Sequence, residues 1–188
     1  MASLPWVTGT ALAAITLLEP FPARYRSRGE TQQTLSGQTR QLGFYESIRA
    51  NISWAPPPAV YSIWFVLYVL MAIAHTLWVV NAEPVSSTAH YNAVWIVYFV
   101  HLFFNKIWSF LFFGLRSRLG VTLGLVDIVI TAALAIAQLV LYATYGAPVL
   151  TYVFWSVYLA WVLFASALSV AIFTKRSVLS YGNERKYQ

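Results

Sequence analysis

Four long apolar stretches, separated by short connections, set the pattern of this chain. They cover residues 58–80, 90–113, 120–144 and 148–173. Each stretch is long enough to cross the hydrocarbon core of a bilayer as a helix, which takes about 20 mostly apolar residues. Because the connections between the stretches are short, we expect consecutive helices to pack as antiparallel neighbours.

A shorter apolar stretch opens the chain over residues 4–18 and ends at Glu19 and Pro20. A cleaved signal peptide is one interpretation, but no basic residue precedes the stretch and no small-residue cleavage pattern stands out. We therefore interpret residues 1–20 as a short first transmembrane helix that is retained. The sequence thus predicts an all-α integral membrane bundle of five transmembrane helices, four of them within residues 58–174.

Residues 21–57 form a long loop between the first two predicted helices. Its middle part, residues 29–40, is polar. Apolar residues then recur at three- and four-residue spacing, at Leu42, Tyr45, Ile48 and Ile52. This spacing predicts an amphipathic helix, either lying on the membrane surface or acting as a lid over a site.

The same loop ends in the segment Trp54-Ala55-Pro56-Pro57-Pro58. Proline is tolerated in the first turn of a helix but not in its interior. The prolines therefore predict a stiff entrance into the second helix, with Trp54 as an anchor at the membrane interface.

The composition supports a membrane protein. The chain is 59% hydrophobic and only 10% charged, whereas a soluble domain carries about 25% charged residues. Too few charges are present to cover a water-facing surface. The chain has no cysteine, which excludes disulfides, thiol nucleophiles and thiolate metal sites.

The net charge of +6 comes from basic residues that gather in the long loop, the 114–119 connection and the C-terminal tail, residues 175–188. They are Arg24, Arg26, Arg28, Arg40, Arg49, Arg116, Arg118, Lys175, Arg176, Arg185 and Lys186. With five spans, all of these fall on one side, which we expect to be cytoplasmic, with the N-terminus opposite. Such loops indicate contact with anionic lipid and no nucleic-acid partner. Bacterial inner, mitochondrial outer and plastid membranes all fit this pattern.

Ionisable residues within the spans are candidates for function. Lys106 and Asp127 lie at similar depths, about 10–15 Å inside the basic face, on neighbouring antiparallel helices. They are interpreted either as an ion pair that fixes helix register or as a polar contact for a ligand. His75 and His101 lack a carboxylate or second histidine at helical spacing, so we expect them at helix interfaces and predict no metal site.

Two helix faces combine aromatic residues with small or polar ones. Asn105 and Trp108 share a face at three-residue spacing, and Trp161 precedes Ala165 by one turn. The small Ala165 beside the large Trp161 leaves room for a flat group. Ordinary helix packing and aromatic belts at the membrane interface are the alternative interpretation of these residues.

These features, in this order, resemble the TspO/MBR family, the translocator proteins also called peripheral-type benzodiazepine receptors or tryptophan-rich sensory proteins. The resemblance runs from about Phe44 to Arg176. The matching segments are Phe44-Tyr45, Trp54-Ala-Pro-Pro57, Trp64-Phe-Val-Leu-Tyr68 with Met71 and Ala74, Phe104-Asn105-Lys-Ile-Trp108, Phe112-Phe113-Gly114-Leu-Arg116, Asp127 and Tyr158-Leu-Ala-Trp161-Val-Leu-Phe164-Ala165.

The chain also departs from the family pattern. Val157 stands where the family usually has proline, Ser169 where it usually has asparagine, and Lys106 is unusual in its segment. The loop around residues 22–40 is longer than usual. These departures affect the expected identity of the ligand more than the expected fold.

The resemblance implies a five-helix bundle with a ligand pocket, since family members bind porphyrins and some bind sterols, cholesterol included, or synthetic aromatic ligands. Carried over to this chain, the pocket residues are Trp64, Asn105, Trp108, Trp161 and Ala165. Trp54, Pro56 and Pro57 would shape its entrance. An apolar aromatic pocket with a few polar groups suits a flat lipophilic molecule.

The expected function is therefore that of a membrane receptor or transporter-like protein for a porphyrin, a sterol or a similar flat lipophile. No cofactor is required, although a porphyrin, heme or lipid is an expected occupant of the pocket, and homodimers are expected for the family. One alternative is an accessory structural subunit of a larger membrane complex. Another is oxidative porphyrin breakdown, but the sequence offers no acid–base pair for it, and we do not favour an enzyme.

Overall fold

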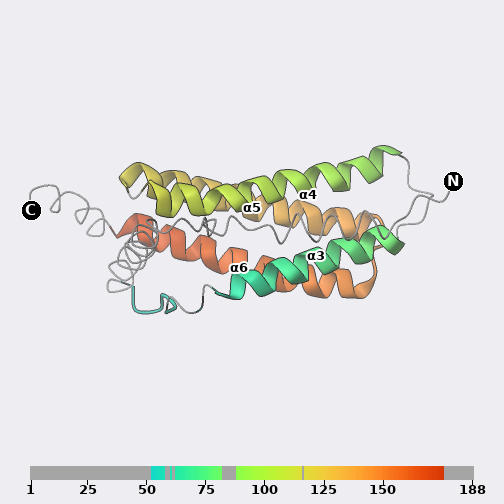
Figure 1. Ribbon diagram of the computed structural model, residues 1–188, viewed down its shortest axis with the longest axis horizontal. Helices are drawn as coiled ribbons and strands as arrows, with labels where there is room; N and C mark the ends of the chain where they lie inside the picture. Colours follow the sequence, from blue (N-terminus) through green and yellow to red (C-terminus); the bar gives the residue numbers. More distant parts are fainter. Residues whose placement is uncertain (1–51, 58–59, 61, 82–87, 116, 176–188) are drawn as a thin grey trace, which may run out of the picture.

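The computed structural model describes residues 52–57, 60, 62–81, 88–115 and 117–175. Within these residues the chain forms α3 (Ile63–Asn81), α4 (Thr88–Ser109), the π-helical turn η2 (Phe110–Gly114), α5 (Arg118–Thr144) and α6 (Val149–Thr174). The helices run side by side along the long axis of the molecule (Figure 1). The predicted first helix, the amphipathic segment and nearly all of the C-terminal tail lie outside the described residues.

The four described helices are all long and apolar enough to cross a membrane. Their mean hydropathy lies between 1.6 and 2.3, and η2 extends the second of these spans to Gly114. The prediction of an all-α membrane protein is confirmed to this extent. The number five stays a prediction, because the remaining helix was placed in residues 1–20.

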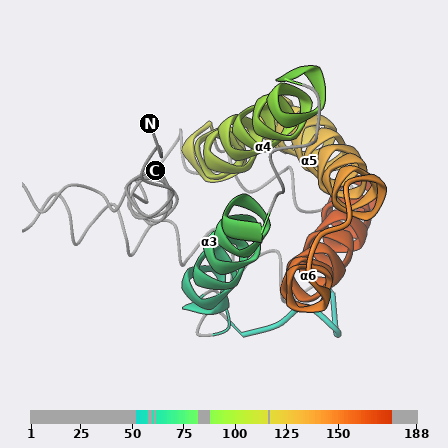
Figure 2. The same cartoon turned by 90° about the vertical axis from the view of Figure 1, so that its right-hand side faces the viewer.

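Seen from one end, the helices form a ring in which α5 lies between α4 and α6 (Figure 2). The closest backbone packing joins α4 to α5, α5 to α6 and α3 to α6. Helices α3 and α4 are consecutive in sequence, but they meet mainly through large side chains. The ring of His75 stacks on Tyr98 at 3.8 Å between centroids, and Trp78 stacks on Tyr91 at 5.5 Å. Aromatic side chains of this size hold the two backbones apart.

The ends of α5 and α6 follow from local sequence. Ser117 caps α5, because its hydroxyl accepts a hydrogen bond from the Gly120 N–H at 3.1 Å. The turn to α6 passes through Gly146, whose φ of 65° is in the left-handed region that glycine adopts without steric cost. Pro148 then precedes α6, where a missing N–H costs nothing.

The second predicted span begins later than the sequence suggested. We expected it from Pro58, but α3 begins at Ile63. Before it, the Val60 N–H donates to the Pro57 carbonyl at 2.9 Å. Proline also disfavours the α-helical conformation in the residue before it. A run of prolines therefore delays the first α-helical turn.

Candidate functional site

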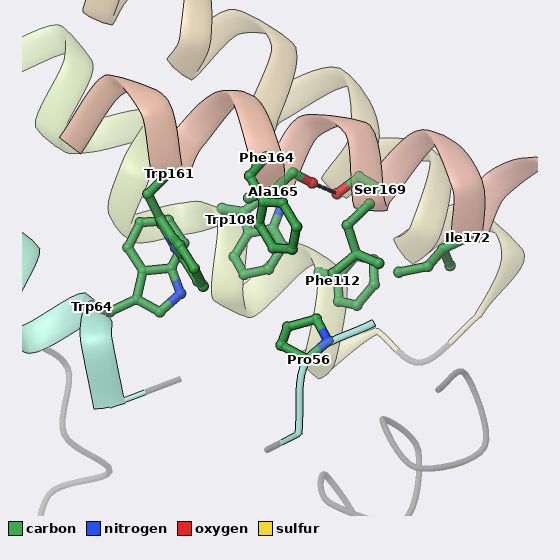
Figure 3. A pocket seen from close by; sticks show the side chains of 10 residues that line it. Pro56, Trp64, Trp108, Phe112, Trp161, Phe164, Ala165, Ser169 and Ile172 are labelled. Atoms are coloured by element: carbon green, nitrogen blue, oxygen red, sulfur yellow. Dashed lines mark hydrogen bonds between the residues drawn. The ribbon is translucent and has the colours of Figure 1, made fainter. Parts of the chain in front are cut away.

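An apolar pocket opens at the end of the bundle where α3 begins and α6 ends (Figure 3). Its empty volume, with the open mouth included, is about 360 Å³. The residues around it come from the proline segment, α3, α4, η2 and α6. They are Pro56, Trp64, Trp108, Phe112, Trp161, Phe164, Ala165, Leu168, Ser169 and Ile172.

Indole rings from different helices form the inner wall of this pocket. The Trp64 ring of α3 lies 6.3 Å from Trp108 of α4 and 6.1 Å from Trp161 of α6, measured between centroids. The Trp64 and Trp161 planes meet edge to face at 86°, whereas those of Trp64 and Trp108 are tilted by 36°. Both separations fall within the range of direct aromatic contact. The wall is therefore assembled only when α3, α4 and α6 come together.

Helix α6 supplies the longest side of the pocket. Trp161, Ala165, Ser169 and Ile172 recur at three- and four-residue spacing, which places them on one helix face. Ala165 is small and buried, so the face is hollow between its larger neighbours. The Ser169 hydroxyl donates to the Ala165 carbonyl at 2.9 Å, so its proton is already used within the helix.

Phe112 reaches the pocket from η2. Its ring stacks on Trp108 with 5.1 Å between centroids and an angle of 15°. Behind it, η2 approaches α5 closely at Gly124, where an added Cβ would lie 2.9 Å from the Phe112 ring. The π-helical turn and the glycine together place Phe112, and such turns are frequent at functional sites.

The structure brings most of the predicted pocket residues together. Pro56, Trp64, Trp108, Trp161 and Ala165 all line the pocket. Ligand binding by these residues stays a prediction.

The remaining predicted residues do not line the pocket, although Trp54 and Pro57 were expected only at its entrance. Trp54 is 49% exposed and touches Phe164 edge to face, with ring centroids 5.8 Å apart. Pro57 is exposed and follows Pro56, which lines the pocket. Asn105 does not line this pocket, because it lies a turn deeper than Trp108 and its amide donates to the Tyr158 hydroxyl at 2.7 Å.

Sequence reasoning missed several lining residues, namely Phe112, Phe164, Leu168, Ser169 and Ile172. Helical spacing from Trp161 and Ala165 would have found those on α6, since they continue the same face. The same spacing from Trp108 points to Phe112, four residues on.

A buried polar cluster lies next to Trp108 in the bundle. The Tyr158 hydroxyl meets the Nε2 atom of His101 at 2.8 Å and the amide of Asn105 at 2.7 Å. Similarly, the Nδ1 atom of His75 meets the Tyr142 hydroxyl at 2.7 Å and links α3 to α5. Both histidines therefore lie at helix interfaces with hydrogen-bond partners.

The intramembrane charges Lys106 and Asp127 lie on neighbouring helices, and their pairing stays a prediction. The Lys106 ammonium lies 3.9 Å from the centroid of the Tyr68 ring of α3. Asp127 is buried, and its Oδ2 atom has no hydrogen-bond partner in the part of the chain that the structure describes. Lys106 thus has a contact with α3.

Comparison with known proteins matches residues 29–174 to the TspO/MBR family. The chain belongs to the TspO/MBR family. It is similar to the tryptophan-rich protein TspO of Archaeoglobus fulgidus, with 32% identity over 139 residues that cover 73% of this chain and 80% of the relative. It is also similar to the tryptophan-rich protein TspO of Chlorobaculum tepidum, with 30% identity over 139 residues, 71% of this chain and 80% of the relative. No solved structure matches the chain.

Membership in the TspO/MBR family agrees with the fold. Together with the apolar helices it establishes an integral, multi-pass membrane protein with a lipid bilayer as its surroundings. It also indicates a membrane receptor- or transporter-like role. The tryptophans that line the pocket belong to the segments that resemble TspO/MBR proteins.

Proposed function

We propose that this protein is a membrane receptor or transporter-like protein that binds a porphyrin, a sterol or a similar flat lipophile in the pocket between α3, α4 and α6. The observation that supports this most directly is the convergence of Trp64, Trp108 and Trp161 on the hollow at Ala165. Aromatic faces around a slot favour a planar guest, because ring stacking adds to the burial of apolar area.

The size of the pocket sets a condition on this binding. Ligand pockets in proteins measure about 300–1,000 Å³, whereas the comparable cavity volume here is about 20 Å³, since the empty volume of about 360 Å³ includes open solvent. A tetrapyrrole macrocycle therefore enters only if the aromatic walls part. Trp64 and Trp161 are half-buried, whereas Trp108 is buried, so Trp64 and Trp161 are the rings that would rotate.

Titration of the purified protein in nanodiscs tests the proposal. We expect protoporphyrin IX to bind with a shift of its absorption band, and we expect Trp64→Ala and Trp161→Ala to weaken binding by about tenfold or more each, since each removes a wall of the slot. Phe99→Ala is the matched control, because Phe99 is an exposed aromatic residue of α4 outside the pocket. Affinity unchanged by both tryptophan substitutions would refute this location for the site.

A further inference from the structure

Lys106 is a charged residue inside an apolar membrane-spanning segment, Ala89–Gly114. A charge at such a position is costly, and residues of this kind commonly mark functional sites. The ammonium lies over the ring of Tyr68, 3.9 Å from its centroid. A cation–π contact of this kind stabilises the ammonium inside the bundle.

The position of Lys106 connects it to the pocket. The Tyr68 ring lies 5.9 Å from the ring of Trp64, a pocket residue one helical turn earlier on α3. The distance from the Lys106 nitrogen to the Trp64 ring centroid therefore cannot exceed the sum of 3.9 Å, from the nitrogen to the Tyr68 centroid, and 5.9 Å, from there to the Trp64 centroid. The flexible four-carbon stem of lysine lets the ammonium move over several ångströms, so the inner edge of the pocket is within its reach.

The hydrogen-bonding groups of the pocket point to the same kind of guest. The polar side-chain groups of its lining residues are the indole N–H groups of Trp64, Trp108 and Trp161 and the hydroxyl of Ser169. An indole N–H is a donor only. Those of Trp108 and Trp161 are buried without a hydrogen-bond partner among the described residues. A guest that satisfies them must bring an acceptor.

We propose that Lys106 makes this pocket select flat lipophiles that carry a carboxylate over their neutral analogues. This inference rests on the proposed binding function. A carboxylate accepts hydrogen bonds from both an indole N–H and an ammonium, and charge-assisted bonds of this kind are about twice as strong as neutral ones. In the low dielectric of the bundle, the attraction between the two charges is also much larger than in water.

A paired titration tests the selectivity. The probes are protoporphyrin IX, which has two carboxylates, and its dimethyl ester, which has the same ring and no charge. Neutral phosphatidylcholine nanodiscs avoid competition from anionic lipid. We expect the acid to bind about tenfold more tightly than the ester, the difference typical of one charge-assisted contact. Lys106→Met should abolish this preference while leaving the ester affinity unchanged, and Lys106→Arg should retain most of it.

The controls separate selectivity from folding. Lys175→Met removes a charge from an exposed residue just after α6 and should leave the preference intact. Equal affinity of the unmodified protein for acid and ester would overturn the inference alone. So would an equal loss of both probes in Lys106→Met, because that result indicates a purely structural contact between Lys106 and Tyr68. If neither probe binds to the unmodified protein, the proposed binding function itself fails.

Discussion

At the scale of single residues, the hollow of the pocket depends on Ala165. It is 8% exposed and lies between Trp161 and Ser169 on the pocket face of α6. A larger side chain there would occupy the space that a ligand needs. Substitution of Ala165 therefore tests directly whether a ligand occupies the empty volume of the pocket.

We predict that Ala165→Phe weakens porphyrin binding by more than about tenfold, since its ring fills the slot between the tryptophans. Absorption titration in nanodiscs measures the effect. Ala167→Phe serves as the control, because Ala167 is exposed on the same helix and outside the pocket. If Ala165→Phe binds as the unmodified protein does, the guest lies elsewhere.

Asn105 shows what the spacing of residues in the sequence cannot predict. Its three-residue spacing from Trp108 indicates a shared helix face, and the resemblance to the TspO/MBR family implied that it lines the pocket. That spacing also separates the two residues by about 4.5 Å along the axis, enough for Asn105 to meet Tyr158 of α6 instead. The partner comes from a residue 53 positions away in sequence, which no local pattern could supply.

At the scale of elements, the close approach of η2 to α5 positions Phe112. Gly124 is buried, and a Cβ built on it would lie 2.9 Å from Cδ2 and 3.1 Å from Cβ of Phe112. A methyl group there must displace the π-helical turn or α5. Gly120 and Gly124 have the four-residue spacing of small residues that is common in membrane helices, but this spacing does not indicate the π-helical turn that Gly124 faces.

We predict that Gly124→Ala destabilises the protein by about 1–3 kcal/mol, the usual cost of overpacking. The sign of this change in stability is informative, because alanine in place of glycine normally stabilises a helix by about 0.5–1 kcal/mol. Thermal unfolding in detergent measures the change. Gly114→Ala is the control, since its Cβ would meet only the exposed ring of Phe110, at 3.3 Å. A more stable Gly124→Ala variant would contradict the packing described at η2.

The apolar helices were predictable because lipid imposes a strong constraint on sequence. A span must be long and nearly uncharged, so the stretches that became α4, α5 and α6 are evident without a structure. The pairing of helices is harder to predict. Lys106 lies over the Tyr68 ring of α3, and this contact could not be predicted from depth in the membrane, because depth does not specify the rotation of a helix.

At the scale of the whole molecule, the pocket lies at the same end of the ring of helices as Arg118 and Lys175. This is the end where α3 begins, α5 begins and α6 ends. If the pocket takes a lipophile with a carboxylate, Arg118 and Lys175 would attract it toward this end. Long-range attraction of this kind raises the rate of encounter more than the affinity.

The orientation of the bundle in its membrane is a prediction that the sequence makes from its charges, and the absence of cysteine makes it simple to test. We expect Ser117→Cys, at the start of α5, to react with a membrane-impermeant maleimide from the cytoplasmic side. Ala147→Cys, in the turn before α6, should react only from the opposite side. Labelling of right-side-out and inverted vesicles measures both.

The two positions flank opposite ends of α5, so they control for each other. Ser117 is exposed and Ala147 is half-buried, which makes both accessible to a small reagent on their own side. Reversed labelling would place the pocket and its basic end outside the cytoplasm, because the pocket lies at the Ser117 end of the bundle. A ligand would then have to be collected from the other compartment, and the charge-guided approach would act there instead.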